Sequence, residues 1–298
     1  MLIVIADDME PEVVTELKKL GSVEYKPADL RITLHSADVL IVRSATKVTK
    51  ELLEFAHQLK IVVRAGIGLD NVDQDACKSR GIKVINTPGA STNAVAELAI
   101  GLILATSRNV QKAHHQMKNG LWDKKNLLGR EIYGKTLGIF GYGRIGSALA
   151  KKAMALGMLV IAYSPPPRYE DGIVEFVDEF DRFLAQSDVI SIHAALTDGT
   201  RNRINKDAFA KMKKGVFIVN TARGEIINED DLYAACKSGQ VGGAALDVYK
   251  SEPYKGKLLE LDNVYFTPHL GAGTKEAQER IGKELVRVLK EELTVDKE

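Results

Sequence analysis

The segment Gly141-Tyr142-Gly143-Arg144-Ile145-Gly146 lies near the middle of this 298-residue chain. An apolar run over residues 137–140 precedes it, and a helical pattern over residues 147–156 follows it. Glycines at this spacing between a strand and a helix permit a tight turn and let the backbone approach the pyrophosphate of a dinucleotide. The segment therefore predicts a Rossmann cofactor unit. Because such a unit begins with its first strand, the residues before about position 90 are expected to form a second domain.

The composition excludes several classes of partner. Lysine and arginine number 41 and aspartate and glutamate 40, which gives a net charge of +1. Without an overall basic field, the chain is not expected to bind nucleic acid or a membrane surface. The two cysteines, Cys77 and Cys236, lie in different expected domains and lack the spacing of metal ligands. We therefore expect free thiols, no metal site and a cytoplasmic location.

Short β-rich runs alternate with helical patterns along the chain, which favours parallel sheets built from βαβ units. We predict two doubly wound α/β domains: a flavodoxin-like substrate domain (residues 1–90 plus 272–298) and an inserted Rossmann cofactor domain (residues 91–271). A buried helix is expected over 93–107, and a last helix, 275–293, is expected to pack back on the N-terminal unit. The predicted strands cover residues 2–6, 23–25, 39–42, 61–63 and 84–85, and then 136–140, 159–163, 189–193, 216–220, 244–248 and 264–267.

Three candidate catalytic residues lie near the carboxyl ends of predicted strands, where open α/β sheets bind their ligands. Arg223 lies in Asn-Thr-Ala-Arg-Gly, Glu252 in Ser-Glu-Pro, and His269 in Thr-Pro-His-Leu-Gly-Ala. A guanidinium binds a carboxylate in bidentate fashion and keeps its proton. Histidine exchanges protons near neutral pH, and a neighbouring carboxylate favours its charged form. These groups suit hydride transfer between a nicotinamide cofactor and a hydroxy acid.

The order of these segments resembles that of the D-isomer-specific 2-hydroxyacid dehydrogenase family over essentially the whole chain. The resemblance implies that Arg223 orients the substrate carboxylate and carbonyl, that His269 is the general acid or base, and that Glu252 stabilises the imidazolium. It also implies that Asp247 contacts the nicotinamide carboxamide. The cofactor-binding residues expected in all are Gly141, Gly143, Arg144, Ile145, Gly146, Ser164, Ala194, Thr221, Ala222, Asp247 and Gly271.

Within that family, segments 42–49, 64–73 and 268–278 are most similar to D-3-phosphoglycerate dehydrogenases. This similarity implies oxidation at C2 of 3-phospho-D-glycerate to 3-phosphohydroxypyruvate, the first step of serine biosynthesis, by a short form that lacks an appended regulatory domain. The substrate phosphate needs an anion site remote from Arg223, and Arg43 and Arg64 follow adjacent predicted strands. The substrate-binding residues expected are Arg43, Ser44, Arg64, Gly66, Ile67, Gly68 and Lys124.

The resemblance further implies a homodimer or a dimer-based oligomer, in which residues 122–128 lie near the neighbouring subunit. Lys124 would reach the site of that neighbour, although arginine is more usual at its position. The nearer alternative function is a glyoxylate or hydroxypyruvate reductase, or another D-2-hydroxyacid dehydrogenase, on the same scaffold. An NAD-sensing binding module, as in transcriptional corepressors of this fold, is the remote one.

The end of the second Rossmann strand departs from the usual pattern. An acidic residue there normally binds the ribose hydroxyls of NAD, whereas this chain has Ser164, followed by Pro165-Pro166-Pro167-Arg168. The resemblance favours NAD, but NADP stays open because no carboxylate would repel a 2′-phosphate and a cation lies nearby. His193, at another strand end, is expected to line the cofactor groove without acting as an acid or base.

Overall fold

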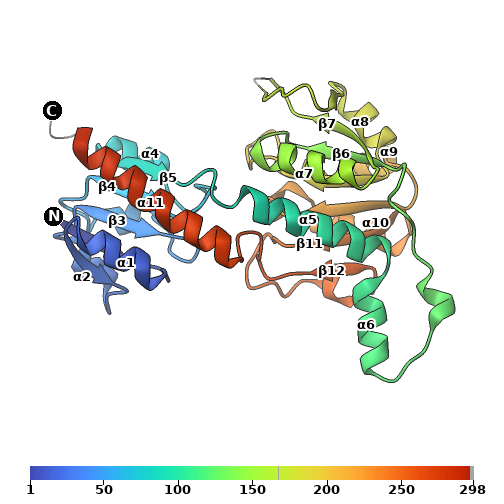
Figure 1. Cartoon of the computed structure of the whole chain (residues 1–298), viewed down its shortest axis with the longest axis horizontal. Coiled ribbons are helices and arrows are strands. Elements are labelled where there is room, and N and C mark those ends of the chain that lie inside the picture. The colour runs from blue at the N-terminus through green and yellow to red at the C-terminus, as the bar shows by residue number, and fades with distance from the viewer. Residues whose placement is uncertain (167, 296–298) are drawn as a thin grey trace. The chain divides into compact units, whose positions relative to one another are not determined.

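The computed structural model describes residues 1–166 and 168–295. Pro167, within the proline run after Ser164, and the last three residues of the expected substrate domain lie outside the described residues. The chain forms two compact α/β units, Met1–Ser91 with Ala272–Glu298, and Thr92–Gly271. We call them unit 1 and unit 2 (Figure 1).

Unit 1 is a five-stranded parallel sheet with the flavodoxin-like order β2-β1-β3-β4-β5. Helices cover both faces, so β1 and β3 are apolar along their whole length and β4 is apolar up to Arg64 at its end. One face packs on α1 and the last helix, α11, where Ile281, Leu285 and Leu289 are buried. The expected return of the last helix to this unit is therefore confirmed. The elements are β1 (Leu2–Ile5), α1 (Pro11–Lys18), β2 (Ser22–Tyr25), α2 (Leu30–Leu34), β3 (Val39–Val42), α3 (Lys50–Leu53), β4 (Ile61–Arg64), α4 (Gln74–Ser79), β5 (Lys83–Asn86) and α11 (Lys275–Val295).

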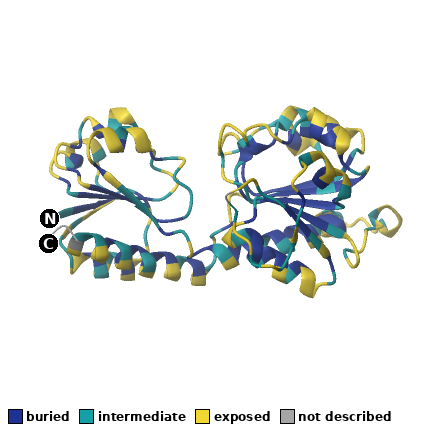
Figure 2. Cartoon of the chain, turned by 90° about the horizontal axis from the view of Figure 1, so that it is seen from above, coloured by how far each residue is buried: buried dark blue, intermediate teal, exposed yellow. Residues whose placement is uncertain are grey.

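Unit 2 is a seven-stranded parallel sheet with the order β12-β11-β10-β9-β6-β7-β8, a Rossmann arrangement. Residues of α5 and α7 pack on one face and residues of α8, α9 and α10 on the other. Figure 2 shows the result, buried strands beneath helices whose outer faces are exposed. The elements are α5 (Thr92–Ser107), α6 (Val110–Lys118), η1 (Lys124–Leu127), β6 (Thr136–Phe140), α7 (Arg144–Ala155), β7 (Leu159–Tyr163), β8 (Glu175–Phe176), α8 (Phe180–Gln186), β9 (Val189–Ile192), α9 (Lys206–Lys211), β10 (Val216–Asn220), η2 (Gly224–Ile226), α10 (Glu229–Lys237), β11 (Val241–Leu246), η3 (Lys257–Glu260) and β12 (Val264–Phe266).

Two elements begin three residues earlier than the sequence predicts, and one strand was missed. Helix α7 begins at Arg144, inside the glycine segment, because the third glycine belongs to its first turn. Strand β8 was not predicted, since two residues carry no periodicity. Strand β11 begins at Val241, three residues earlier than predicted, because Gly242 and Gly243 have low strand propensity. The strand also ends earlier than predicted, at Leu246, so Asp247 lies just beyond it.

No helix in the described residues has both the length and the apolar character needed to cross a lipid bilayer.

Candidate active site

The glycine segment forms a tight turn between β6 and α7 in unit 2. Gly141 has a φ of +92°, and a Cβ there would lie 2.3 Å from the backbone nitrogen of Ala194 at the end of β9. A Cβ on Gly146 would lie 2.8 Å from the carbonyl oxygen of Gly141. Both positions therefore require glycine for close backbone packing.

The turn also fits a dinucleotide. A Cβ on Gly143 would meet nothing within 4 Å, so this residue leaves bare backbone beside open space. Gly143 is the N-cap of α7, and it supplies no side-chain hydrogen bond to the first turn. The first N–H groups of a helix carry partial positive charge and have no partner within the helix, which suits the binding of a pyrophosphate. The residues present thus fit the expected cofactor.

The segment after β7 is attached to the glycine turn by Asp171. Its carboxylate accepts hydrogen bonds from the Tyr142 hydroxyl at 3.0 Å and from the Ser147 hydroxyl at 2.6 Å. Burial raises the pKa of Asp171, but hydrogen bonds from Ser147, Ile173 and Tyr142 outweigh burial and lower it. The carboxylate therefore stays ionised and ties this segment to α7. The sequence offers no signal that distinguishes Asp171 from its acidic neighbours.

Arg168, the cation expected near Ser164, is paired with two carboxylates. Ser164 is half-buried just after β7. The guanidinium of Arg168 lies 2.8 Å from a Glu170 carboxylate oxygen, contacts Asp178, and stacks over the Phe176 ring at 4.2 Å. Two carboxylates thus compensate the charge of Arg168.

His193 follows β9, with hydroxyls near both ring nitrogens. The Ser191 hydroxyl lies 2.8 Å from Nε2 and the Thr221 hydroxyl lies 3.5 Å from Nδ1. Burial lowers the pKa of His193 to about 4. The imidazole is therefore neutral at physiological pH and is unsuited to carry a proton in catalysis.

Arg223 lies in a turn that the buried Asn220, at the end of β10, holds from both sides. The Asn220 side chain accepts a hydrogen bond from the N–H of Ala222 at 3.0 Å and donates one to the carbonyl of Arg223 at 2.9 Å. Gly224 follows, and a Cβ there would lie 2.0 Å from the carbonyl carbon of Tyr249. The missing side chain lets the Arg223 turn pack directly on the segment after β11.

Glu252 and His269 form the central pair of the site. His269 Nδ1 lies 2.9 Å from Glu252 Oε2, and the N–H of Tyr249 donates to Glu252 Oε1 at 3.3 Å. Because the carboxylate accepts the Nδ1 proton, Nε2 is the ring nitrogen left to exchange a proton with a ligand. The structure therefore links the Arg223 turn, through Tyr249, to an oriented histidine.

Asp247 has a structural role that the sequence did not indicate. Its carboxylate is fully buried and accepts hydrogen bonds from the Thr267 hydroxyl and from the N–H groups of Leu270 and Gly271 at 2.6 to 2.9 Å. Burial outweighs these bonds and raises the pKa of Asp247. The hydrogen bonds to Asp247 fix the turn in which His269 has a φ of +55°. This left-handed conformation costs about 1–3 kcal/mol, and the surrounding contacts offset that cost. Contact of Asp247 with a nicotinamide carboxamide stays a prediction.

In unit 1, Arg43 and Arg64 lie at the same edge of the sheet. Arg64 ends β4 and pairs in register with Val42, the last residue of β3. The guanidinium of Arg43 donates to the side-chain oxygen of Gln278 at 2.6 Å and to the carbonyl of Asp8 at 3.3 Å. Both acceptors are uncharged, so these hydrogen bonds place the guanidinium without pairing it with a carboxylate. The Asp8 carboxylate, which pairs with Lys26 at 2.7 Å, also interacts electrostatically with the guanidinium.

The loop that contains Arg43 and Ser44 is anchored by Asp7. This buried carboxylate accepts from the N–H of Arg43 at 2.6 Å and from the N–H and hydroxyl of Thr46 at 3.2 and 2.6 Å. Asn71 donates to the carbonyls of Arg43 and Thr46 at 2.7 and 2.6 Å. The anchors leave Ser44 exposed. The sequence analysis did not single out Asp7, the buried aspartate after β1 that holds this loop.

The segment from Gly66 to Gly68 presents its N–H groups in a fixed direction. The carbonyl of Gly66 accepts from the N–H of Thr87 at 3.0 Å, and that of Ile67 accepts from the Asn86 side chain at 2.6 Å. Because C=O and N–H point oppositely across a trans peptide, the N–H groups of Ile67 and Gly68 point away from β5. A Cβ on Gly66 would overlap the Arg64 guanidinium in its present position, and the φ of +149° at Gly66 is one that residues with a side chain rarely adopt.

The remaining predicted residues take their places in unit 2. Ala194, Thr221 and Ala222 follow β9 and β10 at the edge that holds Gly141, and Lys124 is exposed at the start of η1. Among the described residues, no group of three or more His, Cys, Asp or Glu side chains is arranged to hold a metal ion.

Comparison with known proteins agrees with this geometry. A family model described as D-isomer specific 2-hydroxyacid dehydrogenase, NAD binding domain, matches residues 100–271. A hydroxypyruvate reductase from Thermotoga maritima is 52% identical over 271 residues, which cover 90% of this chain and 88% of that protein. A D-3-phosphoglycerate dehydrogenase from Methanocaldococcus jannaschii is 44% identical over 98% of this chain, which spans only 58% of that protein.

A solved structure extends the match to both units. The D-lactate dehydrogenase from Aquifex aeolicus, complexed with NAD and lactic acid, has a TM-score of 0.89 at 31% identity and covers 99% of this chain and 96% of that one. The NAD-binding family model and this complex support a nicotinamide cofactor. With the glycine turn, the oriented histidine and these relatives together, the chain belongs to the D-isomer-specific 2-hydroxyacid dehydrogenase family.

Proposed function

We propose that the chain interconverts a D-2-hydroxy acid and its 2-oxo acid, with 3-phospho-D-glycerate and 3-phosphohydroxypyruvate as the preferred pair. The 2.9 Å contact between His269 Nδ1 and Glu252 Oε2 carries the chemical part of the proposal. When bound, a nicotinamide cofactor supplies or accepts the hydride at C2.

The residues of unit 2 handle the proton and the substrate carboxylate. In oxidation, His269 Nε2 accepts the proton of the C2 hydroxyl, and Glu252 stabilises the imidazolium through Nδ1. In reduction, Nε2 returns that proton to the carbonyl oxygen. Arg223 binds the carboxylate through its planar fork of N–H groups and keeps C2 in place.

The phosphate part of the proposal depends on unit 1. Arg43 is directed by neutral acceptors at the sheet edge shared with Arg64, which supports a site for a second anion. A charged hydrogen bond is worth about 1.5–3 kcal/mol, or roughly ten- to hundredfold in binding.

Steady-state rates of NADH oxidation with phosphohydroxypyruvate, hydroxypyruvate and glyoxylate test this proposal. Phosphohydroxypyruvate should give the highest kcat/KM, and Arg43→Ala should lower that value about ten- to hundredfold while changing the value for hydroxypyruvate less than about threefold. The matched control is Arg31→Ala, which removes an arginine of α2 that lies over the Phe55 ring. It should leave kcat/KM unchanged for both substrates. Equal losses for both substrates in Arg43→Ala would refute the phosphate site.

Hydroxypyruvate is the second candidate substrate. The Thermotoga maritima relative, 52% identical over 90% of this chain, is named a hydroxypyruvate reductase. A wild-type kcat/KM that is higher for hydroxypyruvate than for its phosphate ester would favour this function. The same chemistry at His269, Glu252 and Arg223 would serve both.

We also propose NAD as the cofactor. Glu170 and Asp178 compensate the charge of Arg168, so a 2′-phosphate near Ser164 would gain little from that cation. NADH should exceed NADPH in kcat/KM by at least about tenfold. The double variant Glu170→Gln with Asp178→Asn removes both carboxylates that pair with Arg168, and it should reduce the ratio of kcat/KM for NADH to kcat/KM for NADPH. A wild-type preference for NADPH would overturn the assignment.

The exposed apolar surface of unit 2 supports a homodimer. Helix α6 has no buried residue, and it extends with the following loop away from the body of the unit (Figure 1). Trp122 is 81% and Leu128 90% exposed, a pattern typical of an interface. Light scattering should show a dimer, and Trp122→Ser with Leu128→Ser should shift it toward monomer. Tyr169→Ser, which removes an exposed aromatic elsewhere, should not.

A further inference from the structure

A cavity of about 240 Å³ opens in unit 2 at the edge of the sheet opposite the candidate active site. Lys135 precedes β6, Asp188 precedes β9, and Lys214 precedes β10, so the cavity lies at the amino ends of these strands. Arg223 and the glycine turn follow the carboxyl ends. A five-residue strand such as β10 is roughly 16 Å long, so the two sites are separate.

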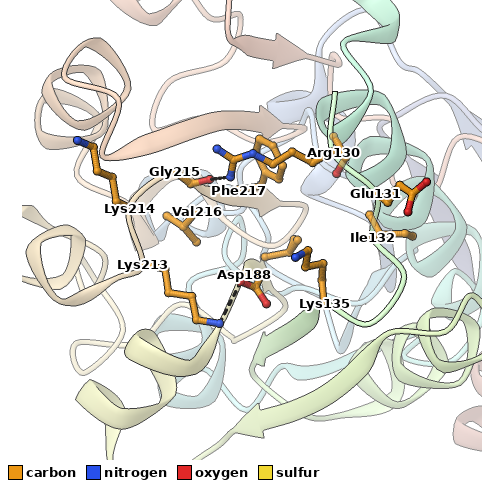
Figure 3. A pocket seen from close by; sticks show the side chains of 12 residues that line it. Arg130, Glu131, Ile132, Lys135, Asp188, Lys213, Lys214, Gly215, Val216 and Phe217 are labelled. Carbon is orange, nitrogen blue, oxygen red and sulfur yellow. Dashed lines mark hydrogen bonds and ion pairs between the residues drawn. The ribbon is translucent and has the colours of Figure 1, made fainter. Parts of the chain in front are cut away.

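Cations dominate the lining. Arg130, Lys135, Lys213 and Lys214 face two acidic residues, Glu131 and Asp188. The Arg130 guanidinium donates to the carbonyl of Gly215 at 2.8 Å, and Lys213 pairs with Asp188 at 3.0 Å, as Figure 3 shows.

The charge of Asp188 is used within the protein. Its second oxygen accepts from the N–H of Thr136 at 2.9 Å, while the first pairs with Lys213. Burial raises the pKa of Asp188, but Thr136, Lys213 and Lys135 outweigh burial and lower it. Within the described parts of the chain, neither Lys135 nor Lys214 lies within 4.0 Å of a carboxylate oxygen. The lining therefore carries four cations against two carboxylates, a net positive charge, although Lys135 and Lys214 are exposed to solvent.

A buried hydroxyl without a partner also lines the cavity. Ser107, the last residue of α5, is 1% exposed, and its Oγ has no hydrogen-bond partner among the described residues. A buried polar group in this state is uncommon, because leaving it unpaired costs about 1–3 kcal/mol. This Oγ is not accessible to solvent, so a ligand oxygen accepts its hydrogen bond once the Ser107 side chain turns toward the cavity. Charge and hydroxyl are separate observations that indicate the same class of ligand.

We propose that this cavity binds a small anion with phosphate or carboxylate oxygens, at a site distinct from the substrate and cofactor sites. Its volume is below the roughly 300–1,000 Å³ of pockets for drug-sized ligands, so the ligand is smaller than a drug-sized molecule. Arg130 offers donors in a planar fork and Lys135 offers a point charge. Lys214 adds its charge at the rim, with its amine directed away from the other lining side chains (Figure 3). Ser107 supplies the neutral donor.

Calorimetric titration of inorganic phosphate, and separately of malonate, into the NADH-saturated protein tests the proposal. NADH fills the pyrophosphate site, and Arg43→Ala removes the proposed substrate-phosphate contact. Lys135→Ala with Lys214→Ala should weaken one of the two anions at least tenfold, and Ser107→Ala should weaken the same anion. Lys211→Ala with Lys237→Ala, on α9 and α10 outside the cavity lining, is the matched control and should bind like the wild type.

The two anions identify the chemistry of the ligand. Loss of phosphate binding indicates a phosphoryl group, and loss of malonate binding indicates a carboxylate. The proposal is overturned if neither anion binds the NADH-saturated wild type, or if binding is lost only in Arg43→Ala. It is equally overturned if the Lys135 and Lys214 double variant binds both anions as tightly as the wild type.

Discussion

Replacing Gly224 with alanine should separate the two segments that bring Arg223 toward the Glu252–His269 pair. The new Cβ would lie 2.0 Å from the carbonyl carbon of Tyr249, 2.4 Å from the N of Lys250 and 2.5 Å from the Cα of Tyr249. All three atoms are backbone, so no side-chain rotation relieves the clash. Carbon atoms pack at about 3.5–4.0 Å, and the segments must therefore move apart by roughly 1.5 Å.

The magnitude follows from that displacement. Overpacking of this kind costs about 1–3 kcal/mol of the free energy of unfolding. A misplacement of about 1 Å at reacting groups can lower the rate about a hundredfold. We therefore expect kcat/KM to fall by about two orders of magnitude while the protein still folds. The carboxylate site at Arg223 moves, whereas the glycine turn does not, so the dissociation constant of NADH should change little.

Urea unfolding, NADH fluorescence titration and steady-state kinetics measure these three quantities. Gly101→Ala is the control, because Gly101 is an exposed residue of α5 and its added Cβ meets nothing within 4 Å. That substitution should stabilise the helix by up to about 1 kcal/mol and leave turnover unchanged. The packing argument fails if Gly224→Ala keeps kcat/KM and the unfolding free energy within error of the wild type.

Two further predictions concern histidines. Glu252→Gln keeps the shape but not the charge beside His269, so kcat should fall about ten- to hundredfold with little change in the KM of NADH; an unchanged kcat would exclude imidazolium stabilisation by Glu252. The pKa of His193 is about 4 in the folded protein and about 6.5 in the unfolded chain. Between pH 6.5 and pH 4 the unfolded state therefore binds more protons, and the free energy of unfolding falls as the pH decreases through this range. Between pH 7 and pH 5 the wild type should lose about 2 kcal/mol more of its unfolding free energy than His193→Gln, and equal losses in urea titrations would contradict the low pKa.

Most of the fold could be predicted from the sequence, because hydrophobic runs bounded by turns mark parallel strands. The predictions failed where that signal is weak. Gly242 and Gly243 interrupt the hydrophobic run at the start of β11, and β8, with two residues, is too short to show a pattern. The helical pattern after the glycine segment gave no sign that α7 begins at Arg144. Helix caps depend on backbone geometry that a residue pattern does not specify.

The side chains of the site were easier to predict than the contacts that hold them. Arg223, Glu252 and His269 were predicted from residue type at strand ends, and the structure places Glu252 and His269 within hydrogen-bonding distance. The anchoring roles of Asp247 and Asn220 could not be predicted, because both depend on turns that fold back on the side chain. A buried aspartate can bind a ligand or hold a loop, and composition does not distinguish the two.

The most direct test of the proposed chemistry is NADH oxidation by phosphohydroxypyruvate, measured for the wild type and for His269→Gln, with NADH binding followed by fluorescence. The account predicts wild-type turnover, a loss of about 10²- to 10⁴-fold in kcat for His269→Gln, and NADH affinity that stays within about threefold. Wild-type protein that binds NADH but reduces no 2-oxo acid would contradict it and favour a cofactor-sensing module. His269→Gln that keeps wild-type turnover would contradict the assignment of the proton to His269.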